Sequence, residues 1–258
     1  MLRLTTLTSV LALAATTLWA EDIKVGVSPG EHAEIMEEVA KVAAPMGLDI
    51  DVVEFSDYVI PNTALADGDI QANSFQHVPY LDNQMKDRGF DLVVVGNTIT
   101  TPMGIYSDKI EDMASLEDGA KVAIPNDPTN GGRALLLLQD LGLVTLAEGT
   151  GLVPSPLDIE DNPKGLKFLE LDAAQLPRTL ADADIAIINT NYAIASGLNP
   201  KTDSIAMEKA DSPYVNVIVV RKGDEDLPWV KTLVEAYHSD AVKAFIEQAY
   251  NGAVITSW

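Results

Sequence analysis

Residues 121–142 read KVAIPNDPTNGGRALLLLQDLG, and this stretch decides the fold. The apolar run 122–124 ends at Pro125, which predicts a short buried strand followed by a turn. Asp127 is a favoured helix N-cap and Pro128 suits the first helical position, so a helix is expected after the loop. The buried face of that helix would be formed by Leu135, Leu136, Leu137, Leu138 and Leu141.

The loop between this strand and this helix is a favourable place for an anion. A helix N-terminus has free N–H groups and a partial positive charge of roughly half a unit. Arg133 lies about one and a half turns into the helix, and its side chain leans back toward the N-terminus, where its guanidinium can fork onto a carboxylate. Gly131 and Gly132 are expected to leave room for the ligand. A structural arginine paired with one of the many acids is an equally good interpretation of this stretch. The spacing of the glycines does not favour dinucleotides or nucleoside triphosphates.

Length and charge narrow the class of protein. The 258 residues are 47% hydrophobic, which is enough to bury the core of one domain or two small ones. The formal net charge is −22, which argues against nucleic acid and anionic membrane surfaces as partners because both attract basic proteins. An acidic ligand group would therefore have to be bound by a local cation such as Arg133.

Residues 1–20, MLRLTTLTSVLALAATTLWA, have the pattern of a signal peptide. A single Arg3 precedes the apolar run 10–15, and small residues precede an expected cleavage site near Ala20, before Glu21. A membrane anchor needs about 20 apolar residues, and this run is shorter. The sequence contains no cysteine, so neither a disulfide nor a lipid-bearing cysteine is expected. We expect a soluble protein exported to a bacterial periplasm.

From residue 23 onward, apolar strand patterns alternate with amphipathic helix patterns, which predicts an α/β fold. A polar passage at 98–104 suggests a crossover into a second lobe, and the strand at 215–220 is expected to return to the first. Lobe 1 would then comprise 21–100 and 212–258, and lobe 2 would comprise 101–211. A long surface loop is expected at 149–163. Strands are predicted at 23–27, 48–55, 70–74, 92–95, 122–124, 167–171, 185–189 and 215–220, and helices at 31–43, 61–67, 77–88, 128–141, 173–180, 191–196, 228–237 and 240–250.

Two α/β lobes joined in this way form a cleft, and ligands of open α/β sheets bind beyond the carboxyl ends of the strands. The candidates at those positions are aromatic in one lobe and carry amide or guanidinium groups in the other. Such a division suits an amphiphile with a zwitterionic end. Taken singly, an aromatic residue could be core packing, a histidine could be structural, and Asn191 could cap a helix. The candidates are Tyr58, Phe75, His77, Tyr80, Asn130, Arg133, Asn189, Asn191 and Asn216.

Little in the sequence indicates a metal site or a catalytic site. The three histidines, His32, His77 and His238, are far apart in the sequence and no HExxH occurs, so a zinc site is not expected. No GxSxG occurs and there is no cysteine nucleophile. A Ser-His-Asp arrangement assembled by the fold has no positive signal. No cofactor is expected.

Five stretches of this chain, in order along nearly its whole length, resemble the methionine-binding MetQ family, also called NlpA lipoproteins. The resemblance implies a type II-like, two-lobed periplasmic binding protein that closes over methionine in its cleft. The protein would deliver this ligand to an ABC permease with its ATPase. The stretches are NSFQHVPYLD (73–82), IPNDPTNGGRALLLL (124–138), QLPRTL (175–180), INTNYA (188–193) and SPYVNVIVVRK (212–222).

The resemblance also implies roles for the candidates. Arg133 resembles the arginine that binds the carboxylate, and Asn189 and Asn216 resemble the amides that hold the polar end of the ligand. Tyr58, Phe75, His77 and Tyr80 resemble the residues around the thioether side chain, with Asn130 and Asn191 as secondary candidates.

The chain departs from the family at the end of the signal, where Leu18-Trp19-Ala20-Glu21 stands in place of a lipobox cysteine. Two alternatives remain for the function. One is a binder of a related ligand, such as a methionine-containing dipeptide or another apolar amino acid. The other is a periplasmic enzyme or adhesin that uses the same fold.

Overall fold

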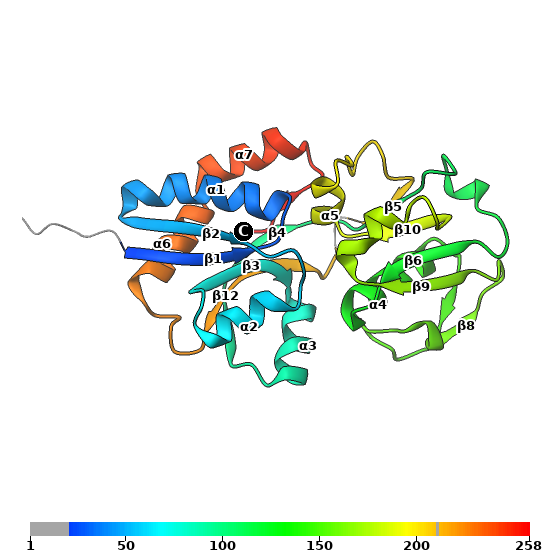
Figure 1. Cartoon of the computed structure of the whole chain (residues 1–258), viewed down its shortest axis with the longest axis horizontal. Coiled ribbons are helices and arrows are strands. Elements are labelled where there is room, and N and C mark those ends of the chain that lie inside the picture. Colours follow the sequence, from blue (N-terminus) through cyan, green and yellow to red (C-terminus); the bar gives the residue numbers. More distant parts are fainter. Residues whose placement is uncertain (1–20, 210–211) are drawn as a thin grey trace, which may run out of the picture.

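The computed structural model describes residues 21–209 and 212–258, so the predicted signal peptide lies outside the described residues. Two lobes lie side by side, each built on its own sheet (Figure 1). Lobe 1 has a six-stranded sheet in the order β13-β4-β12-β3-β1-β2, and lobe 2 has a five-stranded sheet in the order β11-β5-β10-β6-β9. Among the described residues, no helix combines the length and apolarity that crossing a membrane requires.

The order of elements along the chain is the alternation that the sequence predicts, with short additional strands. Lobe 1 begins with β1 (Glu21–Val27), α1 (Glu31–Ala43), η1 (Ala44–Met46), β2 (Leu48–Glu54), α2 (Ile60–Asp67), β3 (Ala72–His77), α3 (Val78–Arg88) and β4 (Leu92–Thr100). Lobe 2 contains β5 (Gly104–Tyr106), η2 (Met113–Ser115), β6 (Lys121–Pro125), α4 (Pro128–Asp140), β7 (Thr145–Leu146), η3 (Pro156–Asp158), β8 (Ile159–Asp161), β9 (Lys167–Leu171), η4 (Ala173–Thr179), β10 (Ile185–Ile188), α5 (Thr190–Ala195) and β11 (Ala206–Met207). The chain then returns to lobe 1 with β12 (Val215–Arg221), α6 (Pro228–Tyr237), α7 (Asp240–Tyr250) and β13 (Ile255–Thr256).

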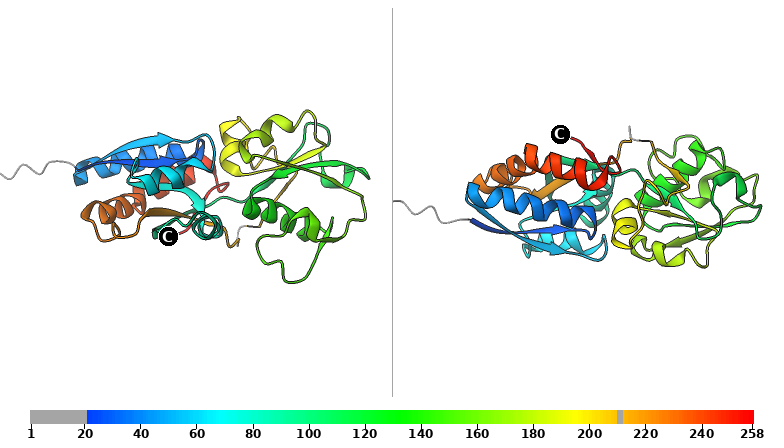
Figure 2. Two further views of the ribbon diagram at one scale, coloured as in Figure 1. Left: turned by 60° about the horizontal axis from the view of Figure 1, so that its bottom comes forward. Right: turned by 90° about the horizontal axis from the view of Figure 1, so that it is seen from above.

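The sheet of lobe 1 is covered on both faces, which explains why its central strands are apolar at consecutive positions. In β12, Ile218 and Val220 pack in the cluster that holds residues of α1, α6 and α7. Val217 and Val219 point to the other face and pack with residues of α2 and α3. Figure 2 shows the same layering from two other directions.

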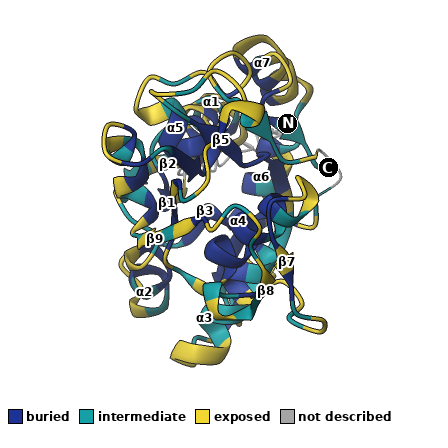
Figure 3. Cartoon of the chain, turned by 90° about the vertical axis from the view of Figure 1, so that its right-hand side faces the viewer, coloured by how far each residue is buried: buried dark blue, intermediate teal, exposed yellow. Residues whose placement is uncertain are grey.

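Lobe 2 repeats this arrangement around β10. Ile185 and Ile187 pack in the cluster that contains the leucines of α4. Ala186 and Ile188 face the opposite cluster, which contains residues of η4 and α5. Viewed from the lobe 2 end, buried residues occupy the central strands and the inner helix faces, and exposed residues lie on the outer loops and on edge strands such as β8 and β9 (Figure 3).

The predicted bounds of the strand at 70–74 are wrong, because β3 runs from Ala72 to His77. Phe75 and His77 therefore lie within a strand instead of after it. His77 pairs with Asn216 of β12, and the side chains of Asn62, Asn73 and Gln76 hydrogen-bond one another. These partners satisfy the hydrogen-bonding groups of β3, whose polar sequence has no local strand pattern.

β4 also extends beyond its prediction, to Thr100 instead of residue 95. β4 therefore includes the first residues of the polar passage at 98–104, and the crossover follows Thr100. The cause is pairing with β12 and β13 on either side, which holds the polar residues of β4 in the sheet.

Two helix predictions need correction. The segment predicted as a helix at 173–180 is the 3₁₀ helix η4, because Pro177 lies inside it. The helix predicted at 191–196 is α5, and its N-cap is Asn189, so Asn191 is not a cap. The loop predicted at 149–163 holds η3 and β8, and the short strands β5, β7, β8, β11 and β13 are not predicted by the sequence.

The leading stretch forms the predicted strand and helix, β6 and α4. Asp127 is the N-cap and its side chain accepts a hydrogen bond from the backbone N–H of Asn130. Leu141, predicted to be buried, is 41% exposed because it lies at the C-cap, where α4 leaves the core. A Cβ on Gly131 would lie 2.7 Å from Pro125 O, and one on Gly132 would lie 2.8 Å from Leu152 O. The space at these glycines is therefore taken by neighbouring backbone and not by a ligand.

Candidate functional site

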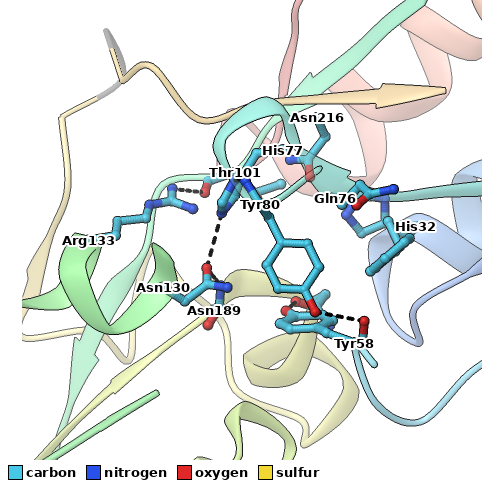
Figure 4. A pocket seen from close by; sticks show the side chains of 12 residues that line it. His32, Tyr58, Gln76, His77, Tyr80, Thr101, Asn130, Arg133, Asn189 and Asn216 are labelled. Atoms are coloured by element: carbon cyan, nitrogen blue, oxygen red, sulfur yellow. Dashed lines mark hydrogen bonds between the residues drawn. The ribbon is translucent and has the colours of Figure 1, made fainter. Parts of the chain in front are cut away.

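All nine residues singled out from the sequence line one pocket between the lobes (Figure 4). The aromatic side chains come from lobe 1 and the guanidinium comes from lobe 2, as expected. The amides come from both lobes, because Gln76 and Asn216 lie in β3 and β12 of lobe 1. The lining residues are His32, Tyr58, Phe75, Gln76, His77, Tyr80, Thr101, Asn130, Arg133, Asn189, Asn191 and Asn216.

Three lining residues, His32, Gln76 and Thr101, are missing from the sequence prediction. His32 lies in the first turn of α1, directly after β1, so the rule that selects residues beyond strand ends would have found it. Gln76 is part of the quoted stretch 73–82, between two selected residues. Thr101 lies in the crossover passage, which has no strand or helix pattern of its own.

The aromatic wall of the pocket is built from Tyr58, Phe75 and Tyr80. Each pair of these rings has its centroids 6.0 Å apart, in tilted or edge arrangements. The hydroxyl of Tyr80 donates to the backbone oxygen of Tyr58 at 2.8 Å, which fixes the two rings relative to each other. The three rings pack against one another and form one apolar wall of the pocket, which we call the aromatic triangle.

Arg133 is 3% exposed and already holds an internal acid, Glu208. Its Nε lies 3.1 Å from each carboxylate oxygen of Glu208, and its Nη2 lies 2.5 Å from Oε2. Nη2 also donates to Thr101 O at 2.8 Å, and the Tyr214 ring lies 4.4 Å from the guanidinium carbon. Arg133 therefore both forms a structural ion pair with Glu208 and lines the pocket.

This ion pair changes the expected geometry at Arg133. The edge formed by Nε and Nη2 is occupied by Glu208, so it is not available to fork onto a ligand carboxylate. Nη1 makes no hydrogen bond to any residue of 21–209 or 212–258. An anion in the pocket can therefore be bound only end-on, through Nη1.

Within residues 21–209 and 212–258, four hydrogen bonds outside the crossover segments join the two lobes. Tyr58 donates to Asn191 Oδ1 at 2.6 Å, and His77 Nε2 lies 3.2 Å from Asn130 Oδ1. Farther out, Tyr192 donates to Ser56 O at 3.2 Å, and Lys201 Nζ donates to Asn251 O at 2.8 Å. We call these four contacts the lobe bridges.

Two buried polar atoms of the pocket amides have no hydrogen-bond partner among the described residues. They are the acceptor Asn189 Oδ1 and the donor Asn191 Nδ2. Buried polar groups are rarely left unpaired, so each indicates a position for a polar atom of a ligand or for water.

Glu31, in the first turn of α1, is fully buried close to this site. Neither of its carboxylate oxygens has a hydrogen-bond partner in the described part of the chain. Burial raises the pKa of the Glu31 carboxyl from its usual value of 4.5 to about 8, and the nearby charge of Glu34 adds to the rise. The preceding Gly30 has φ +86°, and a Cβ there would lie 2.5 Å from Asn191 O of lobe 2.

Comparisons of sequence and of structure both find similar proteins along nearly the whole chain. The D-methionine-binding lipoprotein MetQ of Escherichia coli K12 is 52% identical over 239 residues, which cover 92% of this chain and 88% of that protein. Lipoprotein 28 of the same strain is 47% identical over 242 residues, covering 93% of this chain and 89% of the other. A nutrient-binding protein from Burkholderia cenocepacia, solved bound to methionine, superposes with a TM-score of 0.90 at 52% identity. That alignment covers 92% of this chain and all of the other, and the likeness to solved methionine-binding proteins confirms the two-lobed fold.

The sequence resemblance to this family is confirmed by a family model that covers almost the whole described chain. The model of the NlpA lipoprotein family matches residues 23–258, from the first strand to the last residue. The chain belongs to the NlpA lipoprotein family.

Proposed function

We propose that this protein binds methionine in the pocket between its lobes and delivers it to an ABC permease with its ATPase. The observation that carries the proposal is the pocket itself, with an aromatic triangle on one side and unpaired amide and guanidinium groups on the other. Two similar proteins support the choice of ligand, one named for D-methionine binding and one solved with methionine bound.

The unpaired groups divide into donors and acceptors, as a zwitterion requires. Arg133 Nη1 and Asn191 Nδ2 are donors and would bind the carboxylate. Asn189 Oδ1 is an unpaired acceptor. Asn216 donates through Nδ2 to Ile99 O at 3.1 Å, so its Oδ1 is also an acceptor. These two oxygens would bind the ammonium group, and the side chain would lie among Tyr58, Phe75, His77 and Tyr80.

The proposal makes the protein a transport component that performs no chemistry on its ligand. The lobes, 21–100 with 212–258 and 101–211, would close over the ligand as rigid bodies, with bending confined to the two crossovers. The permease would meet the closed form. The contacts of this chain offer no specific support for a second, enzymatic function.

We expect the pocket to prefer methionine over branched side chains by roughly tenfold to a few hundredfold. A thioether gains about 0.3–1.5 kcal/mol from each ring edge that it meets. The three rings pack against one another, and an unbranched side chain can lie along this wall more closely than one branched at Cβ or Cγ. Norleucine should bind slightly less tightly than methionine. The measurement is a calorimetric competition series against unliganded protein with L- and D-methionine, norleucine, leucine, glutamine and glycyl-methionine.

The control for this series is Phe75→Ala, which opens the aromatic triangle without touching the polar end. The preference for methionine over leucine should shrink, and the requirement for a free carboxylate should persist. Tighter binding of leucine or glutamine would contradict the thioether assignment. Tighter binding of glycyl-methionine would make a dipeptide the ligand and leave the aromatic assignment in place.

We propose that the protein works in the periplasm, and that it does so without the lipid that its relatives' names imply. The printed sequence contains no cysteine, and a thioether-linked lipid requires one. Intact mass measurement of protein from a periplasmic extract should give a chain that begins at or near Glu21 with no added mass. A retained Met1 or an added acyl mass would contradict this prediction.

A further inference from the structure

We propose that Asp127 is a positioning residue that fixes the direction of the hydrogen bonds through the pocket, so that Asn189 presents an oxygen to the ammonium group of the ligand. This inference rests on the proposed function and adds a determinant of specificity to it. Asp127 does not line the pocket. Its effect would be transmitted through Asn130.

The chain of hydrogen bonds begins at the Asp127 carboxylate. It accepts from the backbone N–H of Asn130 at 2.9 Å, from Thr129 Oγ1 at 2.9 Å, and from Asn130 Nδ2 at 3.0 Å to each oxygen. Burial raises the pKa of Asp127, and the hydrogen bonds that it accepts from Asn130 and Thr129 oppose the rise by stabilising the ionised form. The ionised carboxylate can only accept hydrogen bonds. The amide nitrogen of Asn130 must therefore face Asp127, since a flipped amide would place its oxygen against two other oxygens.

The amide oxygen of Asn130 then faces two donors, one from Asn189 and one from His77. Asn130 Oδ1 accepts from Asn189 Nδ2 at 2.8 Å and lies 3.2 Å from His77 Nε2. His77 Nδ1 accepts from the backbone N–H of Tyr80 at 3.1 Å, so the ring proton must be on Nε2 and must point at Asn130. Burial, and then the charge of Arg133, lower the pKa of His77 to about 3, so the ring is neutral near pH 7.

The last step is at Asn189, whose orientation decides which ligands are accepted. Because Nδ2 is committed to Asn130, Oδ1 is the atom left over, and it is buried with no partner among the described residues. An ammonium group has only donors, so it matches this acceptor. If the amide of Asn189 were reversed, an N–H donor would take the place of that oxygen and would favour a hydroxyl or carbonyl oxygen over an ammonium group.

The role of Asp127 as a helix cap can be separated from this role. As the N-cap of α4, it accepts the backbone N–H of Asn130. Asparagine and serine cap helices about as well as aspartate. Asparagine, however, also brings a donor, which can bond to Asn130 Oδ1 and favours the flipped amide of Asn130 against the opposing N–H of His77.

The test compares L-methionine with 2-hydroxy-4-(methylthio)butanoate, in which a hydroxyl replaces the ammonium group. Both are titrated by calorimetry into the wild-type protein, Asp127→Asn and a matched control, Asp140→Asn. Asp140 ends α4 at the surface, where its carboxylate pairs with the exposed Lys209. In Asp127→Asn we expect the ratio of methionine affinity to hydroxy-acid affinity to fall at least tenfold. In Asp140→Asn the ratio should stay within twofold of wild type.

An unchanged ratio in Asp127→Asn, or an equal loss for both ligands, would overturn the inference and leave Asp127 as a cap only. If Asp127→Asn does not fold, as judged by circular dichroism, Asp127→Ser is measured in the same way. Serine keeps the cap but removes the acceptor that holds Asn130 Nδ2, which leaves His77 alone to orient that amide. The ratio should again fall, and an unchanged ratio would again contradict the inference. Failure of the wild-type protein to bind methionine would overturn the proposed function and this inference with it.

Discussion

Replacing Arg133 with alanine is expected to weaken methionine binding by roughly 30-fold to several thousandfold. Removing one partner of a desolvated charge pair costs about 2–5 kcal/mol, and each 1.4 kcal/mol is tenfold in affinity. Arg133 is 3% exposed and has Nη1 as its unpaired donor among the described residues. Its loss also leaves Glu208 without its cation beside the pocket, and this uncompensated negative charge would repel the ligand carboxylate.

Companion variants separate these two contributions. Arg133→Ala combined with Glu208→Gln should recover part of the affinity, since the repelling charge is removed. Arg133→Lys should rescue only in part, because one ammonium cannot hold Glu208, Thr101 and a ligand as a planar guanidinium does. Arg221→Ala is the matched control, because Arg221 binds Leu65 O and Ile70 O away from the pocket. Calorimetry that finds wild-type affinity in Arg133→Ala would place the carboxylate elsewhere.

Glu31→Gln is expected to stabilise the fold at neutral and alkaline pH, by roughly 1–3 kcal/mol at pH 7. In the folded protein the Glu31 carboxyl has a pKa of about 8, against 4.5 for the usual value. Below about pH 4.5 both the folded and the unfolded chain hold the proton, and the stabilising contribution is complete. As pH rises toward 8 the unfolded chain releases the proton first, so wild-type stability falls. Glutamine carries no proton to lose and avoids this fall.

Chemical denaturation at pH 4, 6, 7 and 8 measures this difference directly. The gap between Glu31→Gln and wild type should be near zero at pH 4 and should grow up to pH 8. The buried His32 and His77, whose pKa values are lowered to about 4 and about 3 by burial, act in the opposite direction at acid pH. They are present in both proteins and cancel in the comparison. Glu37→Gln, exposed on the same helix, is the control, and an equal gap at pH 4 and pH 8 would contradict a buried ionisation.

The fold was largely predictable because apolar periodicity survives in most of its elements. Local patterns within 121–142 are enough to predict its strand, its helix and the N-cap at Asp127. β3 was misplaced because its sequence ANSFQH is polar and is held in the sheet by β12 and by side-chain amides distant in the sequence. The two-residue strands β7, β11 and β13 exist only through pairing, which no local pattern records.

The sequence predicts which residues line the pocket, but it does not predict which hydrogen bonds and ion pairs they form. Selecting side chains beyond strand ends finds Tyr58, Asn130 and Arg133, because parallel strands end at the same edge of a sheet. The partner of Arg133 was not predictable, since Glu208 is 75 residues away and is one of 39 acidic residues. The orientations of the Asn189 and Asn216 amides likewise depend on Asn130 and Ile99, which are distant in the sequence and are brought close only by the fold.

The lobe bridges have a consequence for how affinity and selectivity are divided in this protein. Bonds such as Tyr58 to Asn191 and Lys201 to Asn251 are made by the chain alone, so they favour the closed arrangement before any ligand arrives. The apparent dissociation constant is the intrinsic one divided by the fraction of molecules already closed. Lys201 and Asn251 do not line the pocket, so a change there alters that fraction equally for every ligand. Absolute affinity can thus be adjusted from the outer bridges while the ranking of ligands stays with the pocket.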